Sequence, residues 1–292
     1  MPRLSVILPA RNAEGTLRRA VLSTLRSLPK DAEIVILNDG SEDRTGEVAT
    51  QFRDPRVRVL HSAGSGGLGN ALNYLLKNTD SQFVARMDAD DVSMPWRFHI
   101  ASLSKDSPYD FVFCPVVDFE RRTIRPGVPS PIRPAAFPFH LLLGNPVCHP
   151  SMFARRVALD RLGGYRQVEA EDYDLWLRAA EAEFGMRRLA PYVVAKREHG
   201  GQVTASPEYY LASRQNPLVG EAFRRLSAQR LGRPFPRLVE LAYVDEQTRK
   251  QTVEDFASAF SAAISRLTSV ERFQLGVKMQ RRLRLVVQEV SS

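Results

Sequence analysis

Three carboxylates stand within four consecutive positions in the stretch Phe83–Arg97 (FVARMDADDVSMPWR). Asp88, Asp90 and Asp91 follow a short apolar run where a strand is expected to end, and Pro95 restarts the chain as a helix. Like charges this close repel one another unless a positive charge lies between them. A divalent cation shared with a phosphorylated ligand supplies that charge. The alternative is an acidic turn that caps the following helix.

Strands and helices alternate around this cluster. The predicted strands are Leu4–Leu8, Glu33–Leu37, Val57–Leu60 and Phe83–Met87, and the predicted helices are Thr16–Leu28, Thr45–Phe52 and one through Ala71–Leu76. This order predicts an α/β fold with a mostly parallel sheet covered by helices on both faces. Polar clusters follow the strands at Arg11/Asn12/Glu14, Asn38/Asp39, Ser65–Asn73 and Asp88–Asp91. Because ligands bind outside the carboxyl ends of such strands, we expect these clusters to converge on one crevice.

The second half is less regular. Asp110–Glu120 predicts a strand pair, and Arg121–Pro138, which is rich in proline and arginine, predicts a loop. His149 lies between apolar residues and is expected to be a hydrogen-bonded structural histidine. Beyond residue 207 the apolar residues recur at helical spacing. We therefore divide the chain into an α/β domain, 1–205, with halves 1–110 and 111–205, and a helical C-terminal region, 206–292.

Composition is that of an ordinary soluble protein. Of 292 residues, 43% are hydrophobic and 25% are charged, and the two cysteines are too few for a disulfide framework. The formal charge is +8, and residues 201–292 hold 14 Lys/Arg against 9 Asp/Glu. The first residues, MPRLSVILPARNAEG, combine a short apolar run with an early charge, unlike a signal peptide. We expect a cytoplasmic protein, or one that also lies peripherally at the inner face of the membrane.

The C-terminal helices are open to two interpretations. Their last predicted segment, 270–290, mixes apolar residues with Lys278, Arg281, Arg282 and Arg284. In the simpler interpretation the helices pack on the catalytic domain or on a second copy, which would form a homo-oligomer. In the alternative, a basic face touches an anionic membrane that carries a lipid-linked acceptor.

Two common nucleotide-binding motifs are missing from the sequence. No GxGxxG opens the first helix and no GxxxxGK[ST] occurs, so neither a dinucleotide-binding fold nor a P-loop NTPase is supported. A nucleotidyltransferase would need a glycine-rich, lysine-bearing loop near the N-terminus, which is also missing. A nucleic-acid or membrane-surface binding protein that uses the basic tail stays an alternative, although no basic stripe interleaved with aromatic residues is present and no nucleic-acid partner is expected.

Five motifs in succession carry a resemblance to a known family. They are SVILPARN (5–12), EIVILNDGSED (33–43), GGLGNALN (66–73), ARMDADDVSMP (85–95) and EDYDLWL (171–177). This set resembles the signatures of the family 2 glycosyltransferases, which have the GT-A fold, a Rossmann-like sheet. The resemblance implies inverting transfer of a hexosyl or N-acetylhexosaminyl group from a nucleotide-diphosphate sugar, most often a UDP-sugar. The implied acceptor is a hydroxyl of a glycan, a lipid-linked molecule or a small molecule, in cell-surface polysaccharide or glycoconjugate synthesis.

The resemblance also implies a nucleotide-sugar site in the first half. Its residues are Pro9, Arg11, Glu14, Asp39, Asn73, Asp88 and Asp91. Asp39 matches the family's aspartate that bonds the edge of the base. Arg11 stands where many members have a tyrosine that stacks on the base, and Ser65 and Leu72 stand where many have Asn and Arg. The contacts to base and pyrophosphate therefore differ from the common pattern.

A divalent metal, Mn²⁺ or Mg²⁺, is implied as the cofactor that neutralises the leaving diphosphate. Asp90 matches the direct ligand of the family's DxD motif, and Asp88 supports it at the ribose or at the metal's waters. His199, in the segment KREHGGQVT (196–204), is a candidate third metal ligand. Arg197 in the same segment is a candidate supporting group for phosphate.

The resemblance places the catalytic base at Asp172. Inversion by direct displacement needs one group that removes the proton of the acceptor hydroxyl. At a helix N-terminus Asp172 is expected to stay ionised, and Glu171 beside it is a candidate for orienting the acceptor. Asp174, Trp176 and Arg178 are interpreted as helix packing and surface, and the alternative for Trp176 is that it lines the sugar pocket. The alternative for Glu171 and Asp172 is simple capping of the helix.

Overall fold

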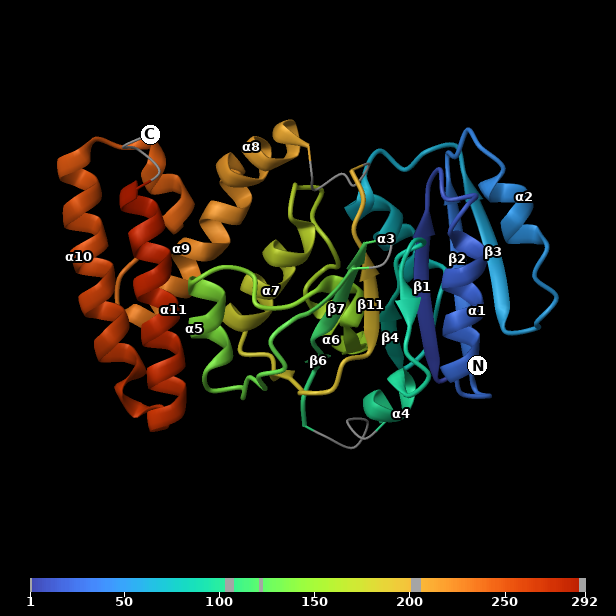
Figure 1. The fold of residues 1–292 in the computed structure, drawn as a ribbon, viewed down its shortest axis with the longest axis horizontal. Coiled ribbons are helices and arrows are strands. Elements are labelled where there is room, and N and C mark those ends of the chain that lie inside the picture. Colours follow the sequence, from blue (N-terminus) through green and yellow to red (C-terminus); the bar gives the residue numbers. More distant parts are fainter. Residues whose placement is uncertain (1, 103–107, 121–122, 201–205, 289–292) are drawn as a thin grey trace. The chain divides into compact units, whose positions relative to one another are not determined.

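The computed structural model describes residues 2–102, 108–120, 123–200 and 206–288 (Figure 1). The chain divides into two compact units whose segments alternate along the sequence. The first unit comprises Met1–Pro131, Val147–Gln167 and Phe184–Gln202, and the second comprises Ile132–Pro146, Val168–Glu183 and Val203–Ser292. The domain boundary predicted after residue 205 falls at the end of the segment 201–205, which lies outside the described residues. This boundary therefore stays a prediction.

Two sheets form the framework of the first unit. Its strands are β1 (Leu4–Ala10), β2 (Ala32–Asp39), β3 (Val57–Ser62), β4 (Phe83–Arg86), β5 (Val92–Ser93), β6 (Phe111–Phe113), β7 (Val116–Glu120), β8 (Thr123–Pro126), β9 (Phe153–Arg155), β10 (Met186–Arg188) and β11 (Val194–Arg197). The seven-stranded sheet has the order β10-β6-β9-β4-β1-β2-β3, and the four-stranded sheet has the order β5-β11-β7-β8. In the larger sheet β9 runs antiparallel to its neighbours, while β1, β2, β3 and β4 pair in parallel. The predicted mostly parallel sheet is confirmed.

Helices cover both faces of the larger sheet. The helices of the first unit are α1 (Leu17–Ser27), α2 (Thr45–Thr50), α3 (Leu68–Lys77), α4 (Arg97–Ser102) and α6 (Arg156–Arg161), with a 3-10 turn, η1 (His149–Ser151). Alternate strand residues such as Val6 and Ile34 form a buried cluster with Leu17 and Val21 of α1. Helix α3 packs against β1 and β2 through other buried residues, among them Leu72. The strand ends are thereby held at one edge of a rigid layer.

Two predictions for the second half are wrong. The stretch 110–120 does contain two strands, but β6 joins the larger sheet and β7 joins the smaller one. Pro115 lies between them and has no N–H with which to continue a ladder. The predicted loop 121–138 contains β8, which pairs antiparallel with β7, and the first two residues of a helix, Phe137 and Pro138. All four residues of β8 are exposed, so the strand carries no apolar alternation by which it could be found.

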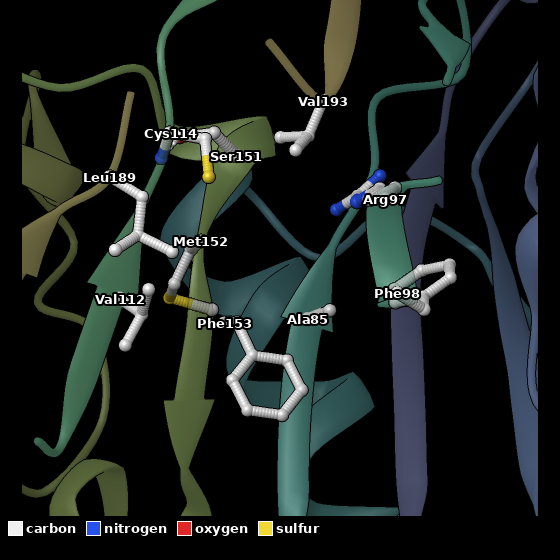
Figure 2. Close-up of a pocket in the computed structure, with 10 residues that line it drawn as sticks. All are labelled: Ala85, Arg97, Phe98, Val112, Cys114, Ser151, Met152, Phe153, Leu189 and Val193. Carbon is white, nitrogen blue, oxygen red and sulfur yellow. Dashed lines mark hydrogen bonds between the residues drawn. The ribbon is translucent and has the colours of Figure 1, made fainter. Parts of the chain in front are cut away.

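A small apolar cavity lies beside β4 in the first unit (Figure 2). Its volume is about 10 Å³, roughly that of one water molecule. The lining includes Ala85, Val112, Met152 and Phe153, and Arg97 is its charged member. The Arg97 guanidinium donates hydrogen bonds to the carbonyl oxygens of Arg86 (2.5 Å) and Pro150 (2.8 Å). This arrangement fixes the end of β4 and leaves no room for a substrate.

The second unit is helical. Its helices are α5 (Phe137–Leu142), α7 (Glu171–Glu181), α8 (Pro207–Gln215), α9 (Pro217–Leu231), α10 (Glu246–Ala263) and α11 (Ser269–Gln288), with 3-10 turns η3 (Leu238–Tyr243) and η4 (Ile264–Arg266). Phe256 and Phe260 of α10 stack at 5.5 Å, and Phe139 and Phe235 meet them edge-on. Helix α7 packs against α9 and α5. Among the described residues, none of the helices combines the length and the apolar character that crossing a bilayer requires.

Candidate functional site

The carboxylates of Asp88, Asp90 and Asp91 converge directly after β4. One oxygen of each lies within 4.8 Å of the corresponding oxygens of the other two. The strand before them is buried throughout and ends in a parallel sheet, so the turn projects from its carboxyl edge. Asp91 is 1% exposed, whereas Asp88 and Asp90 are half-buried. Two carboxylates of the cluster are therefore open to a ligand and one faces the interior.

Three groups of the first unit bind this cluster. The buried guanidinium of Arg86 pairs with Asp88 (Nη2 to Oδ1, 2.5 Å). His199 Nε2 lies 3.0 Å from Asp90 Oδ2. The backbone N–H of Arg197, at the end of β11, donates to Asp91 Oδ1 at 2.8 Å. The structure thus joins the predicted metal residues and the segment 196–199, which are distant in sequence.

The chemistry of this cluster fits a hard divalent cation. Carboxylate oxygens are the ligands that Mg²⁺ and Mn²⁺ prefer. Oδ2 of Asp91 is buried and has no hydrogen-bond partner among the described residues. Burial, followed by the charges of Asp88 and Asp90, raises the pKa of Asp91 to about 9. A cation bound at this cluster would oppose that shift, because positive charge favours the ionised carboxylate.

Asp39 ends β2 at the same edge of the sheet. Its two carboxylate oxygens accept hydrogen bonds from the backbone N–H and the hydroxyl of Ser65, at 2.7 and 2.6 Å. Ser65 belongs to the glycine-rich loop before α3, in which Gly66 and Gly67 have φ of +81° and +142°. Asp39 thus holds this loop against the sheet, and its contact with a base stays a prediction.

The loop after β1 is bonded to the loop after β2. The N–H of Glu14 donates to Asp43 Oδ2 (3.0 Å), and the carboxylate of Glu14 pairs with Arg44 (3.2 Å). Pro9 lies within β1, and Arg11 is exposed at its end. These residues are placed at the predicted edge of the sheet, where Arg11 presents an exposed guanidinium.

Asn73 has a clear structural task. Its amide donates to the carbonyl of Tyr165 (2.8 Å), and its oxygen accepts from the N–H of Tyr165 (2.9 Å). The Tyr165 hydroxyl in turn bonds His149 Nε2 at 2.8 Å. The prediction that His149 is a hydrogen-bonded structural histidine is confirmed, while the donor contact predicted for Asn73 stays a prediction.

In the second unit, α7 presents Asp172 in its first turn. Oδ2 of Asp172 accepts a hydrogen bond from Asn145 Nδ2 at 2.8 Å. Ala170, just before the helix, has φ +61°, a left-handed conformation that costs about 1 kcal/mol or more for a residue with a Cβ. Its N–H donates to the hydroxyl of Tyr209 at 2.9 Å. Glu171 is buried, whereas Asp172 is half-buried, so Asp172 is the more open carboxylate.

Other side chains of α7 pack as predicted. Trp176 and Asp174 are fully buried, and Asp174 pairs with Arg178 at 2.8 Å. This confirms that they serve the packing of the helix.

Sequence reasoning missed three partners of the predicted site residues. They are Arg86, Ser65 and Asn145, which bind Asp88, Asp39 and Asp172 in turn. Arg86 could have been found, because a charged residue within an otherwise apolar strand needs a counter-charge nearby. The segment 145–155 resembles one that brings acceptor-side residues into the site, but the contact between Asn145 and Asp172 was not predicted, since 27 positions separate them.

Comparison with known proteins identifies the family. The model of glycosyl transferase family 2 matches residues 5–163, more than half of the chain. The chain belongs to glycosyl transferase family 2. Its activity is glycosyl transfer from a nucleotide sugar, so the predicted family and activity are confirmed in preference to the nucleotidyltransferase and the nucleic-acid or membrane-surface binding protein.

Curated relatives agree with this assignment. The protein named "Putative glycosyltransferase EpsE" of Bacillus subtilis (strain 168) is 32% identical over 211 residues, which cover 68% of this chain and 73% of EpsE. WfaP of Escherichia coli, named UDP-Glc:alpha-D-GlcNAc-diphosphoundecaprenol beta-1,3-glucosyltransferase, is 25% identical over 222 residues, which cover 75% of this chain and 86% of WfaP.

Solved structures confirm the GT-A-like fold. Residues 1–349 of S. aureus TarS in complex with UDP-GlcNAc superpose with a TM-score of 0.65 and 17% identity, covering 100% of this chain and 92% of that one. The mannosyltransferase PcManGT of Pyrobaculum calidifontis, in complex with GDP-Man and Mn²⁺, gives a TM-score of 0.54 and 18% identity, covering 99% of this chain and 87% of that one.

Proposed function

We propose that this family 2 glycosyltransferase is an inverting, divalent-metal-dependent enzyme that uses a UDP-sugar. The observation that carries the proposal is the convergence of Asp88, Asp90 and Asp91 at the carboxyl end of β4, with His199 beside Asp90. Two comparisons support the choice of donor and cofactor: TarS binds UDP-GlcNAc and PcManGT binds Mn²⁺. The loops that follow β1, β2 and β4 form the proposed donor side of the site.

Asp90 and His199 would hold the metal, with Asp88 in support. A bound Mn²⁺ or Mg²⁺ supplies positive charge for the departing diphosphate. Asp88 is already paired with Arg86, which fixes its carboxylate in one orientation, and this leaves Asp90 as the direct ligand. Arg197 is proposed as a phosphate contact and Asp91 as a group that stabilises the turn through the Arg197 N–H.

Asp172 is the proposed base. Its carboxylate would accept the proton of the acceptor hydroxyl while that oxygen attacks the anomeric carbon opposite the leaving diphosphate. The hydrogen bond from Asn145 Nδ2 orients the carboxylate, and the first turn of α7 favours its ionised form. Glu171 is proposed as support for the acceptor. One displacement inverts the configuration of the sugar.

The proposed acceptor is a hydroxyl of a sugar carried on a lipid diphosphate, in the assembly of a cell-surface polysaccharide. WfaP, whose name specifies a diphosphoundecaprenol-linked acceptor, supports this choice. We also propose that the protein works in the cytoplasm, the location predicted from its sequence.

Asp172→Asn tests the base. We expect transfer to fall by about 10²- to 10⁴-fold, because the amide cannot accept the proton, while calorimetry gives unchanged affinity for UDP-sugar and Mn²⁺. Glu181→Gln, at the other end of α7, is the matched control and should leave transfer unchanged. Transfer by the Asp172→Asn variant at the rate of the native enzyme would exclude Asp172 as the base.

Asp90→Ala tests the metal site separately. We expect the Mn²⁺-dependent part of UDP binding to disappear in calorimetry, with no change in the weak binding measured in EDTA. A thermal-shift screen of UDP-sugars and GDP-mannose with Mn²⁺ identifies the donor, and NMR of the product gives its anomeric configuration. Equal UDP affinity with and without Mn²⁺ in the native protein would refute the metal.

A further inference from the structure

Helix α11 exposes large apolar side chains on its outward face. Val270, Phe273 and Val277 are 66%, 72% and 52% exposed. Their spacing of three and four residues places them on one side of the helix. Exposed apolar residues are ordinary singly, but a row of three on one helix face marks a surface that meets another apolar phase.

The same face is positively charged. Arg281 and Arg284 follow Val277 at spacings of four and seven residues, so they continue this row, and both are exposed. The whole helix carries five basic residues and one acidic residue, Glu271, whose carboxylate is bound to Arg133. We define the outer face of α11 as Val270, Phe273, Val277, Arg281 and Arg284.

Two acidic residues of the neighbouring helix α10 are paired with basic residues outside α11. Two of its three acidic residues form ion pairs elsewhere, Glu246 with Lys250 and Asp255 with Arg233. An anionic surface is therefore the complement of the outer face of α11.

One flank of α11, about 100° around the helix from Val270 and Val277, contacts the segment that precedes Asn145. Glu271 bonds Arg133 at 2.7 and 2.8 Å, and Lys278 donates to the carbonyl of His140 at 3.2 Å. These contacts lie on the segment 133–144, which Asn145 follows with its hydrogen bond to Asp172. A flank of α11 thus contacts the segment 133–144, while the outer face is exposed.

We propose that the outer face of α11 docks on an anionic phospholipid bilayer, with the helix lying in the plane of the interface. Phe273 and the valines would enter the boundary between headgroups and acyl chains, and Arg281 and Arg284 would meet lipid phosphates. In a symmetric pair of copies the outer face of α11 would meet itself, which would bring the arginines of the two copies together. That docking brings a lipid-linked acceptor to Asp172 is a further consequence, and it rests on the proposed function.

Sedimentation with vesicles tests the docking without any transfer assay. We expect the full chain to bind vesicles of phosphatidylcholine that contain about 30 mol% phosphatidylglycerol. Its affinity for neutral phosphatidylcholine vesicles should be lower by about tenfold or more. Raising the salt concentration should release the protein, since exposed charges are screened. Equal binding to both vesicles, or no binding to either, would overturn the proposal.

Two variants assign the binding to this face. The double variant Arg281→Gln/Arg284→Gln should weaken binding by about fivefold for each arginine, and Phe273→Glu by about tenfold or more. Val157→Glu, at an apolar helix residue of the first unit that is 51% exposed, is the matched control and should bind as the native chain does. If Val157→Glu weakens binding as much as Phe273→Glu, the face is wrong.

Size-exclusion chromatography with light scattering tests whether a second copy of the chain covers the outer face of α11 instead. We expect a monomer in the absence of vesicles, and a dimer that Phe273→Glu dissociates would overturn membrane docking in favour of a second copy. Hydrolysis of the UDP-sugar by water should be equal in Phe273→Glu and native protein. Loss of vesicle binding with intact donor hydrolysis therefore separates this inference from the proposed function.

Discussion

Replacing Arg86 by methionine removes the buried positive charge beside the acidic cluster. The side chain of Arg86 is 5% exposed and that of its partner Asp88 is 28% exposed. Methionine keeps most of the side-chain volume, so the change removes the charge and the hydrogen bonds without opening a large cavity. Asp88 then stands beside Asp90 and Asp91 without its guanidinium partner.

The expected loss follows from this burial. Removing one partner of a fully buried ion pair costs about 3 to 5 kcal/mol, because a charge stays buried without compensation. Since water reaches about a quarter of Asp88, we expect a loss of about 2 to 3 kcal/mol for Arg86→Met. The midpoint of thermal unfolding should fall by about 5 to 10 °C.

Urea denaturation and a double-mutant cycle measure this loss. Asp88→Asn removes the opposite charge, so the double variant Arg86→Met/Asp88→Asn should be more stable than the sum of the two single losses predicts, by about 1 to 2 kcal/mol. Arg225→Met is the matched control, because Arg225 pairs with Glu221 at side-chain exposures of 56% and 49%. An exposed pair of this kind contributes less than about 0.5 kcal/mol.

Manganese connects the same variant to the metal site. Mn²⁺ restores positive charge to the cluster, so it should raise the unfolding midpoint of Arg86→Met by more than that of the native protein. The reasoning is refuted if Arg86→Met unfolds within about 0.5 kcal/mol of the native protein, or if the two single losses are additive.

Two further predictions concern the scaffold. Gly163 and Gly164 both have φ +72°, but a Cβ at Gly163 meets nothing within 4 Å, whereas one at Gly164 would lie 2.4 Å from Asn73 Oδ1. In urea denaturation, Gly164→Ala should therefore lose at least about 1 kcal/mol more unfolding free energy than Gly163→Ala. Equal losses would contradict the contact between Asn73 and this turn. Hydrogen bonds from Arg133 lower the pKa of Glu271 to about 2. Its ionised form therefore stabilises the fold above about pH 4.5 and the contribution is lost as pH falls from there to about 2, so Glu271→Gln should flatten stability against pH in that window, and an unchanged slope would count against the pair.

The sequence by itself determined the framework of the first unit. Apolar runs of strand length, such as the one before Asp88, alternate with helical stripes, and that alternation is a local property that a chain displays without its fold. It also placed Asp39 and Asp88 at strand ends, because the carboxyl ends of parallel strands share one edge. The ordered motifs then predicted the family.

Only the tertiary structure decided which groups meet. His199 lies beside Asp90 because β11 ends next to the turn after β4, and 109 positions separate the two residues. Strand β8 escaped prediction because all its residues are exposed, and β6 and β7 separate into two sheets around Pro115. The tertiary structure also explains the buried charge of Arg86 in an apolar strand. Its guanidinium pairs with Asp88, and such a pairing decides whether a charge can be buried.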